Sequence, residues 1–295
     1  MNTKFAALLV LICSFMFSLI ANASSESLVN IIKEVERQLH AKVGVSVYSV
    51  SNDDLWHYNG DYRFPLMSTF KTLACAKLLS DVEKGKQSFD ASVMIVKNTL
   101  VPWSPITEKH VDEKFSLKQA CSAAMIMSDN TAANIVLDGI NGPAELTRFM
   151  KTIGDEVTRL DRIEPYLNEA KLADERDTTT PNAIVTSLEK LLYGEILSID
   201  SKDQLRQWMM ENKVSDSLLR SVLPEGWSIA DRSGAGGFGS RGITAAVWSE
   251  NKPPLIIAIY LTQTKASFEA RNKAIAKIGL EIFNSYQNAR KAPYF

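Results

Sequence analysis

The chain has 295 residues, of which 45% are hydrophobic and 23% are charged, a composition typical of a globular protein that buries a sizeable core. This composition excludes disorder and fibrous repeats as descriptions of the whole chain. Its 33 basic and 34 acidic residues give a net charge of -1, so no broad positive field is available to neutralise phosphates, and nucleic acid is not expected as a partner.

The first 23 residues have the pattern of an export signal. Lys4 gives a positively charged start, residues 5–20 are almost wholly apolar, and Ala21-Asn22-Ala23 fits the small-x-small cleavage rule. We therefore expect residues 1–23 to be a signal peptide, and the mature protein to be exported to the periplasm or secreted. An uncleaved anchor is disfavoured because the apolar run is shorter than the roughly 20 residues of a spanning helix. A lipid anchor on Cys13 is disfavoured because Ile12 stands where such sites have a small residue.

The segment after the signal predicts a helix followed by two strands. Apolar residues recur at helical spacing from Leu28 to Leu39 through a charged segment. Alternating valines over 43–47 indicate a strand, and Asn52-Asp53-Asp54 indicates a turn into a second strand over 55–58.

Further strand patterns appear only near the C-terminal end. From 61 to about 212 the patterns are almost exclusively helical. Strands are then predicted over 227–231, 244–248 and 255–262, followed by a long amphipathic helix from Ser267 to about Ala289. Two early and three late strands can form one antiparallel sheet only if both ends of the chain come together.

The predicted architecture is an α/β domain with an all-α domain inserted into it. Residues 24–60 and 213–295 would form a five-stranded antiparallel sheet flanked by helices, and residues 61–212 the all-α domain, with a cleft between the two. The polar segment 159–177 lacks periodicity and predicts a long ordered loop, which in a compact domain is usually functional. No other apolar run is long enough to span a bilayer, so we expect no stable membrane association after cleavage.

The first candidate for chemistry is Ser68-Thr69-Phe70-Lys71, at the predicted start of a helix. The three-residue spacing places the hydroxyl and the amine on one face. Because the helix downstream is apolar nearly all round, burial and the positive helix N-terminus should lower the pKa of Lys71 toward a value useful for a base. The motif alone is weak, since 187–190 and 249–252 also match it and an N-cap serine is the plainer interpretation.

The second candidate is Ser128-Asp129-Asn130, which occurs once and follows a predicted helix over 117–127. Cys75 lies seven residues after Ser68, and Cys121 lies seven residues before Ser128. If the two helices pack antiparallel with both serines at the same end, the cysteines meet. As the only two cysteines left after signal cleavage, they should form a disulfide in an oxidising compartment.

The third candidate, Glu164 with Asn168, lies in the predicted loop. A carboxylate and an amide four residues apart could together hold a water molecule, with Glu164 taking its proton as it attacks an ester. An exposed glutamate is more often simply solvated.

The fourth candidate is Arg232-Ser233-Gly234-Ala235, at the end of a predicted strand, with Arg241 nearby. Cationic and hydroxyl side chains on an edge strand suit an anionic substrate carboxylate. Gly234, Gly236 and Gly239 also match the dinucleotide fingerprint G-x-G-x-x-G, but a strand follows where that fingerprint needs a helix. These glycines therefore predict a hairpin, and no cofactor is expected.

Metal-dependent and histidine-dependent hydrolysis are poorly supported. The three histidines, His40, His57 and His110, are widely spaced and form no ligand pattern, and both mature cysteines are assigned to the disulfide. No metal is expected. A serine-histidine-carboxylate triad is not ruled out by spacing alone, although no histidine has a recognisable catalytic context.

Taken in order, the four motifs resemble those of class A β-lactamases over essentially the whole mature chain. The resemblance implies that Ser68 is the nucleophile, with Lys71 as its amine partner, Ser128 as a proton shuttle and Asn130 as a ligand of lysine and substrate. It also implies that Glu164 and Asn168 hold the deacylating water, that Ser233 and Arg241 bind the substrate carboxylate, and that the N–H groups of Ser68 and Ala235 form an oxyanion hole. The implied partners are a β-lactam and water, and the implied state is a monomer. Whether Lys71 or Glu164 is the acylation base stays open.

One position departs from the family pattern. The family usually has Lys-Thr/Ser-Gly where this chain has Arg232-Ser233-Gly234, and the arginine is similar to that of the carbenicillin-hydrolysing group. A penicillin-binding transpeptidase or carboxypeptidase shares the serine-lysine, serine-x-asparagine and basic-hydroxyl-glycine elements but lacks the deacylating carboxylate. A non-catalytic β-lactam sensor domain would become acylated and remain so. Glu164 with Asn168 favours hydrolysis over the peptidase. A sensor domain would be tethered to a signalling module, for which we expect no room in this chain.

Overall fold

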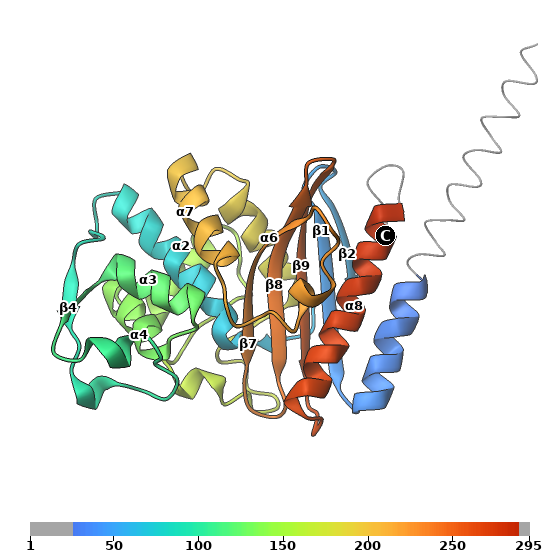
Figure 1. Cartoon of the computed structure of the whole chain (residues 1–295), viewed down its shortest axis with the longest axis horizontal. Helices are drawn as coiled ribbons and strands as arrows, with labels where there is room; N and C mark the ends of the chain where they lie inside the picture. Colours follow the sequence, from blue (N-terminus) through green and yellow to red (C-terminus); the bar gives the residue numbers. More distant parts are fainter. Residues whose placement is uncertain (1–25, 289–295) are drawn as a thin grey trace, which may run out of the picture.

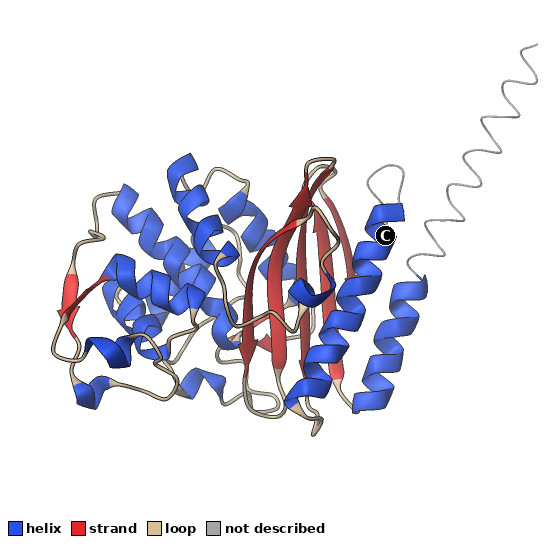
Figure 2. Ribbon diagram, in the orientation of Figure 1, coloured by secondary structure: helices blue, strands red, loops and turns tan. Residues whose placement is uncertain are grey.

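The sheet of this protein is five-stranded, antiparallel and built from both ends of the chain. The computed structural model describes residues 26–288, and the predicted signal peptide and its alternatives, which involve residues 1–23, lie outside that range. The strands are β1 (Lys42–Ser49), β2 (Asp54–Tyr58), β7 (Ser228–Ala235), β8 (Arg241–Ser249) and β9 (Lys252–Thr262). Their order in the sheet is β2-β1-β9-β8-β7, as the labels in Figure 1 show, so β7 is an edge strand. Figure 2 draws the same sheet in red between the helices that cover its two faces. The predicted fold class is confirmed.

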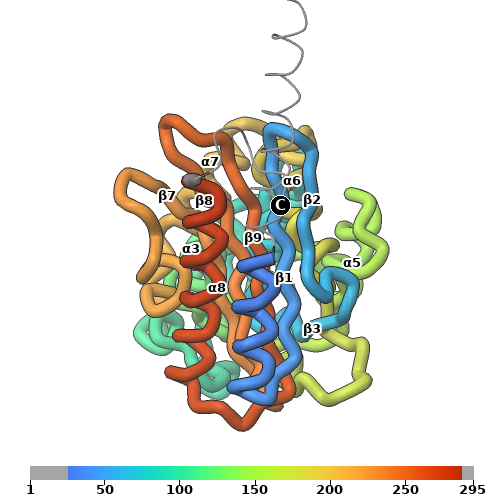
Figure 3. Tube along the Cα trace, turned by 90° about the vertical axis from the view of Figure 1, so that its right-hand side faces the viewer, coloured from blue at the N-terminus to red at the C-terminus, as the bar shows by residue number. Residues whose placement is uncertain are grey.

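Two helices from opposite ends of the sequence lie side by side on the outer face of the sheet. They are the helix over 26–39 and α8 (Phe268–Asn288), and they are adjacent in both views (Figures 1 and 3). Their apolar side chains, among them Ile32 and Ile278, pack on the valines of β1 and on Ile257 and Ile259 of β9. This contact brings the chain ends together, as the strand pattern requires.

The inner face of the sheet contacts the helical part of the molecule. Ile256, Ala258 and Tyr260 of β9 alternate with the outward-facing residues and join the core formed by the helices. Because helices cover both faces, β9 is a nearly continuous apolar run, and it shows no alternation of polar and apolar residues.

The helical part is arranged around α2 (Phe70–Glu83), the most buried helix, whose apolar surface extends nearly all round it. The other helices are α3 (Leu117–Ile126), α4 (Asn130–Gly139), α5 (Pro143–Thr152), α6 (Pro181–Leu192) and α7 (Ile199–Met210). Side chains cap four of their N-termini: Ser116 caps α3, Asp129 caps α4, Thr180 caps α6 and Ser198 caps α7.

The expectation of almost exclusively helical structure over 61–212 needs correction. Short strands pair there: β3 (Phe64–Pro65) with β6 (Thr178–Thr179), and β4 (Ser92–Met94) with β5 (Lys114–Ser116). Strands of two or three residues are too short to show the alternation of polar and apolar residues by which strands are predicted. The sheet strands also extend beyond their predicted ends, since β7 reaches Ala235 and β8 begins at Arg241. Within 26–288, no helix combines the length and the apolar character that crossing a membrane requires.

Candidate active site

Ser68 lies in a tight turn at the edge of the sheet. It belongs to the 3₁₀ turn Met67–Thr69, which leads directly into α2, and its side chain is nearly buried. Met67 has a φ of +50°, a left-handed conformation that costs free energy and persists only where neighbouring contacts hold it. The contact with β7 is close enough that a Cβ on Gly234 would lie 2.7 Å from the Ser68 nitrogen. Glycine at 234 therefore lets the strand lie directly against the Ser68 backbone.

The turn is anchored from below by a buried tyrosine. The Thr69 hydroxyl donates to the Leu66 carbonyl oxygen at 2.6 Å and lies 2.9 Å from the Tyr260 hydroxyl, which is fully buried. Since the Thr69 proton is used on Leu66, Tyr260 is the donor in the second contact. This chain of hydrogen bonds holds the start of α2 on strand β9.

Lys71 is the centre of the polar cluster. Its ammonium nitrogen lies 2.9 Å from the Ser128 carbonyl oxygen, 3.2 Å from Ser128 Oγ, 2.6 Å from Asn130 Oδ1 and 3.4 Å from Glu164 Oε1. Burial lowers the pKa of Lys71 to about 8, although the nearby Glu164 carboxylate opposes this shift. The lowered pKa expected from the sequence agrees with the structure, and burial is its principal cause.

Ser128 connects Lys71 to Ser68. It lies between α3 and α4 with a φ of +58°, and its hydroxyl donates to Ser68 Oγ at 3.1 Å. A disulfide between Cys75 of α2 and Cys121 of α3 joins the two helices that carry these serines. The predicted pairing of the cysteines and the predicted meeting of the two serines are confirmed.

The side chains of Asn134 and Asn168 hold Glu164 in the site through its backbone and its carboxylate. Asn134 of α4 accepts from the Glu164 N–H at 2.9 Å and donates to its carbonyl oxygen at 3.0 Å. Asn168 donates to Glu164 Oε2 at 2.5 Å, and the carboxylate is fully buried. Among the described residues, no donor forms a hydrogen bond with Glu164 Oε1 or Asn168 Oδ1. Buried acceptors of this kind are normally satisfied, so both oxygens can receive a bound donor.

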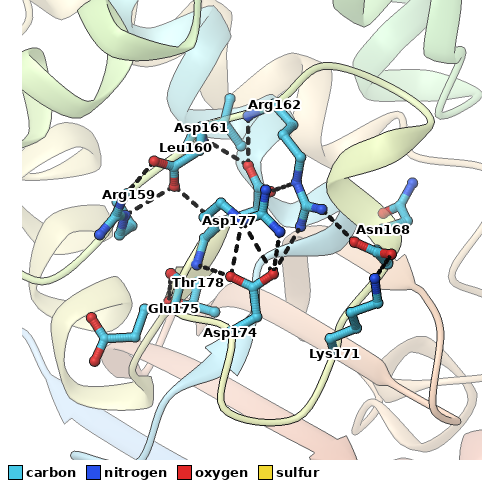
Figure 4. Close-up of polar contacts among 12 residues, drawn as sticks. Arg159, Leu160, Asp161, Arg162, Asn168, Lys171, Asp174, Glu175, Asp177 and Thr178 are labelled. Atoms are coloured by element: carbon cyan, nitrogen blue, oxygen red, sulfur yellow. Dashed lines mark hydrogen bonds and ion pairs between the residues drawn. The ribbon is translucent and has the colours of Figure 1, made fainter.

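A network of charges fixes the loop that carries Glu164 (Figure 4). Asp177 accepts from the backbone N–H groups of Asp161 and Arg162 at 2.8 and 2.9 Å and from Arg162 Nε at 2.5 Å. Arg162 also pairs with Glu169 at 2.6 Å. The segment 159–177 is therefore an ordered loop, as its length and polarity predicted.

Arg232 lies beneath Ser68 and is fully buried. Its Nε donates to the Ser68 carbonyl oxygen at 3.3 Å, and its Nη1 donates to the Met125 carbonyl oxygen at 3.1 Å and to Asn212 Oδ1 at 3.0 Å. Burial lowers the pKa of Arg232 to about 10, so the guanidinium remains a cation at neutral pH. Its predicted contact with a substrate carboxylate stays a prediction.

Ser233, Ala235 and Arg241 lie at the same end of the sheet, where β7 and β8 pair Ala235 with Arg241. Ser233 Oγ donates to the Val214 carbonyl oxygen at 3.4 Å, and Arg241 donates to Asn272 Oδ1 at 2.8 Å. Arg241 is also buried, and burial lowers its pKa to about 10. Residues 236–240 form the turn of the β7–β8 hairpin, so the hairpin interpretation of the glycine pattern is confirmed.

The other serine-lysine matches lie away from this cluster. Ser187 and Lys190 are on α6, where Ser187 bonds Asp155 and Lys190 bonds the Ile153 carbonyl oxygen. Residues 249–252 form the turn between β8 and β9. Among residues 26–288, no three histidine, cysteine, aspartate or glutamate side chains gather as ligands for a metal ion.

Sequence reasoning missed Asn134 and Asn212. Asn134 follows Asn130 by four residues, so both lie on the same face of α4, and that spacing was a usable signal. Asn212 lies outside any motif, and nothing in the sequence connects it with Arg232.

Comparisons with known proteins agree on one family. The sequence profile described as the β-lactamase enzyme family matches residues 27–286. Beta-lactamase PSE-4 of Pseudomonas aeruginosa is 56% identical over 255 residues, which are 86% of this chain and 88% of that protein. Beta-lactamase AER-1 of Aeromonas hydrophila is 47% identical over 288 residues, covering 96% of this chain and 95% of that protein.

Solved structures give the same result. The chromosome-encoded β-lactamase of Vibrio parahaemolyticus superposes with a TM-score of 0.87 at 53% identity, covering 89% of this chain and 100% of the other. An ancestral class A β-lactamase superposes with a TM-score of 0.86 at 42% identity, again covering 89% and 100% of the two chains.

Proposed function

The chain belongs to the class A β-lactamase family, and from that premise we propose that it hydrolyses penicillins, including carboxypenicillins, through an ester on Ser68. The observation that carries this proposal is the buried cluster in which Ser128 Oγ bonds Ser68 Oγ while Lys71 bonds Ser128 and lies beside Glu164. A nucleophile, a proton relay and a buried carboxylate are the groups that a two-step acyl transfer needs.

In the first step Ser68 Oγ attacks the β-lactam carbonyl carbon. A C–O bond forms, the ring C–N bond breaks, and a proton passes through Ser128 to the leaving nitrogen. The N–H groups of Ser68 and Ala235 stabilise the negative charge on the carbonyl oxygen. Support for this arrangement comes from the close contact of β7 with the Ser68 backbone.

The contacts of Lys71 bear on which group takes the Ser68 proton. An ammonium has three N–H donors and no acceptor, and Lys71 has hydrogen bonds to three acceptor atoms on Ser128 and Asn130. Only the ammonium form of Lys71 has enough N–H groups to donate all three of these hydrogen bonds. In that form Lys71 cannot act as a base, so Glu164 takes the Ser68 proton. Lys71 replaces the proton that Ser128 gives to the leaving nitrogen, and Glu164, 3.4 Å away, then returns its proton to Lys71, which restores the carboxylate for the second step.

In the second step Glu164 removes a proton from a water molecule that attacks the ester. The Glu164 oxygen Oε1 and the Asn168 oxygen Oδ1 are two of the three buried side-chain oxygens without a hydrogen-bond partner among the described residues, the third being Thr72 Oγ1. The first two suit a water that donates to both. The ester C–O bond then breaks, the proton returns to Ser68, and the penicilloic acid leaves.

Recognition of the substrate rests on its carboxylate. Ser233 and Arg241 provide a hydroxyl and a cation near the end of β7, and Arg232 adds a second buried cation below Ser68. Arginine at 232 is the feature that leads us to include carboxypenicillins among the substrates.

Four further expectations belong to this proposal. The α/β domain comprises 24–60 and 213–295 and the all-α domain comprises 61–212, with the active site between them. The protein is exported after removal of residues 1–23 and acts as a monomer in the periplasm or outside the cell. Neither a cofactor nor a metal takes part. Hydrolysis of penicillins confers β-lactam resistance on the host.

Ring opening of benzylpenicillin, followed by ultraviolet absorbance, tests the proposal. Many turnovers per protein are expected, and EDTA should not change the rate. A single turnover that leaves a stable adduct would favour the peptidase or the sensor domain. No reaction at all would overturn all three interpretations.

A further inference from the structure

Arg232 is a buried cation whose hydrogen bonds all go to neutral acceptors. These acceptors are two backbone carbonyl oxygens and the Asn212 amide oxygen. No carboxylate within 26–288 forms an ion pair with Arg232, and none of those residues accepts a hydrogen bond from its Nη2. The positive charge of Arg232 and its Nη2 donor are therefore available to an anionic substrate.

The adjacent residue in β7 carries a carboxylate that Arg232 does not use. Neighbouring residues of a strand point to opposite faces, which separates the side chains of Asp231 and Arg232. Asp231 is instead paired with Arg220, which places Nε 2.7 Å and Nη2 2.6 Å from Asp231 Oδ1. The ion pair with Arg220 neutralises Asp231 at the edge of the sheet.

Asn212 spans the two side chains. It lies in the loop after α7 and is 2% exposed. Its Nδ2 donates to the Asp231 carbonyl oxygen and to Oδ2, each at 3.2 Å, and to Ser215 Oγ at 2.9 Å. Its Oδ1 accepts from Arg232 Nη1 at 3.0 Å and from the Val214 N–H at 3.1 Å. Because acceptors surround Nδ2 and donors surround Oδ1, only this orientation of the Asn212 amide satisfies its hydrogen bonds, and the flipped orientation would not.

We propose that Asn212 is a positioning residue that sets the direction of the Arg232 guanidinium and thereby the strength of substrate-carboxylate recognition. The inference rests on the proposed function, because it acts through the role of Arg232 there. With the amide in place, Nη1 is fixed between Asn212 and Met125, and the planar geometry of guanidinium then fixes Nη2. Without the amide, Arg232 would lose the only side-chain acceptor among its described hydrogen bonds.

A double-mutant cycle of Asn212→Ala and Arg232→Lys tests this proposal. The measurements are kcat/KM for benzylpenicillin and for carbenicillin. Asn212→Ala alone should lower kcat/KM for both substrates by about tenfold or more, the range for a hydrogen bond to a charged group. In the Arg232→Lys background, Asn212→Ala should lower kcat/KM by less than about threefold, because lysine has a single nitrogen and no planar group for the amide to orient. Equal losses in both backgrounds would overturn the proposal.

Two further variants separate positioning from folding. Asn212→Asp keeps an oxygen that can accept from Arg232. Beside the buried Asp231 the new carboxyl group should be protonated, and its O–H then donates to Asp231 in place of the amide N–H. With both contacts kept, kcat/KM should recover toward the wild-type value. A loss as large as that of Asn212→Ala would contradict the proposal. Asn182 lies on α6, and Asn182→Ala removes its hydrogen bonds to Ser46 and Asp61, so it should lower the melting temperature and leave kcat/KM unchanged.

If Asn212→Ala does not fold, Asn212→Ser enters the same cycle, because its hydroxyl leaves a smaller cavity and still ends short of Arg232. The same two outcomes then apply. Failure of the wild-type protein to open the penicillin ring is a separate result, which overturns the proposed function before any variant is compared.

Discussion

Replacing Glu164 by glutamine should convert this enzyme into one that is acylated and then stalls. The substitution keeps the shape of the side chain and removes its charge and basicity. The carboxylate is fully buried, with Oε2 bonded to Asn168 at 2.5 Å and Oε1 3.4 Å from Lys71 Nζ. Loss of a general base slows a step by about 10²–10⁴-fold, or about 3–5 kcal/mol in the barrier to deacylation.

Acylation should suffer less than deacylation in Glu164→Gln, for an electrostatic reason. The Glu164 charge raises the pKa of Lys71 against the effect of burial, so its removal lowers that pKa below about 8. More of Lys71 is then a free amine, which can take the Ser68 proton in place of Glu164. Deacylation should suffer more because the neutral glutamine amide cannot take a proton from the water that attacks the ester.

Intact-protein mass spectrometry measures the outcome directly. Within seconds of mixing with benzylpenicillin, Glu164→Gln should carry one penicilloyl group, and absorbance should show one ring opening per protein followed by a slow steady state. Glu250→Gln, in the turn between β8 and β9, is the matched control and should behave like the wild type. A Glu164→Gln protein that turns over freely without an adduct would refute the role of Glu164.

Four further predictions concern other contacts in the structure. Removing both Cys75 and Cys121 should lower the free energy of unfolding by about 4 kcal/mol, since they are 46 residues apart, and unchanged urea denaturation would contradict this. Arg232→Lys should lower kcat/KM more for carbenicillin than for benzylpenicillin, by on the order of 1 kcal/mol, and equal losses would place the preference elsewhere. Because burial lowers the pKa of Lys71 to about 8 and its ammonium form is required, kcat/KM should fall as pH rises through about 8; a rise would instead make Lys71 the base. Asn134→Ala should slow deacylation by about tenfold or more because both of its bonds to the Glu164 backbone are lost, and an unchanged deacylation rate in single-turnover kinetics would argue against this role.

The elements that could be predicted from the sequence are those in which apolar residues recur at a regular spacing. The valines of β1 and the apolar spacing of 28–39 were sufficient to place a strand and a helix, and the positions of strands at both ends required a shared sheet. Short strands such as Phe64–Pro65 could not be predicted, because two residues show no regular pattern and their pairing with Thr178–Thr179 depends on how the helices between them fold.

For the candidate site, sequence reasoning identified residues that belong to spaced motifs and missed those that act across the fold. Cys75 and Cys121 each lie seven residues from one of the serines, and this spacing correctly predicted that Ser68 and Ser128 lie close together. The full burial of Arg232 was not foreseen, since an edge strand suggested exposure, and the loop containing Asn212 covers that edge. Contacts of this kind come from packing between distant segments and leave no local pattern.

The most direct test of the central claim compares Ser68→Ala with the wild type in benzylpenicillin hydrolysis. Ser249→Ala, at another serine-lysine match in the sequence, is the control, and circular dichroism shows whether each variant is folded. We expect Ser68→Ala to lower kcat by at least about 10⁴-fold and to form no adduct, while Ser249→Ala keeps wild-type activity. A folded Ser68→Ala protein that retains substantial hydrolysis would contradict the assignment of Ser68 as the nucleophile.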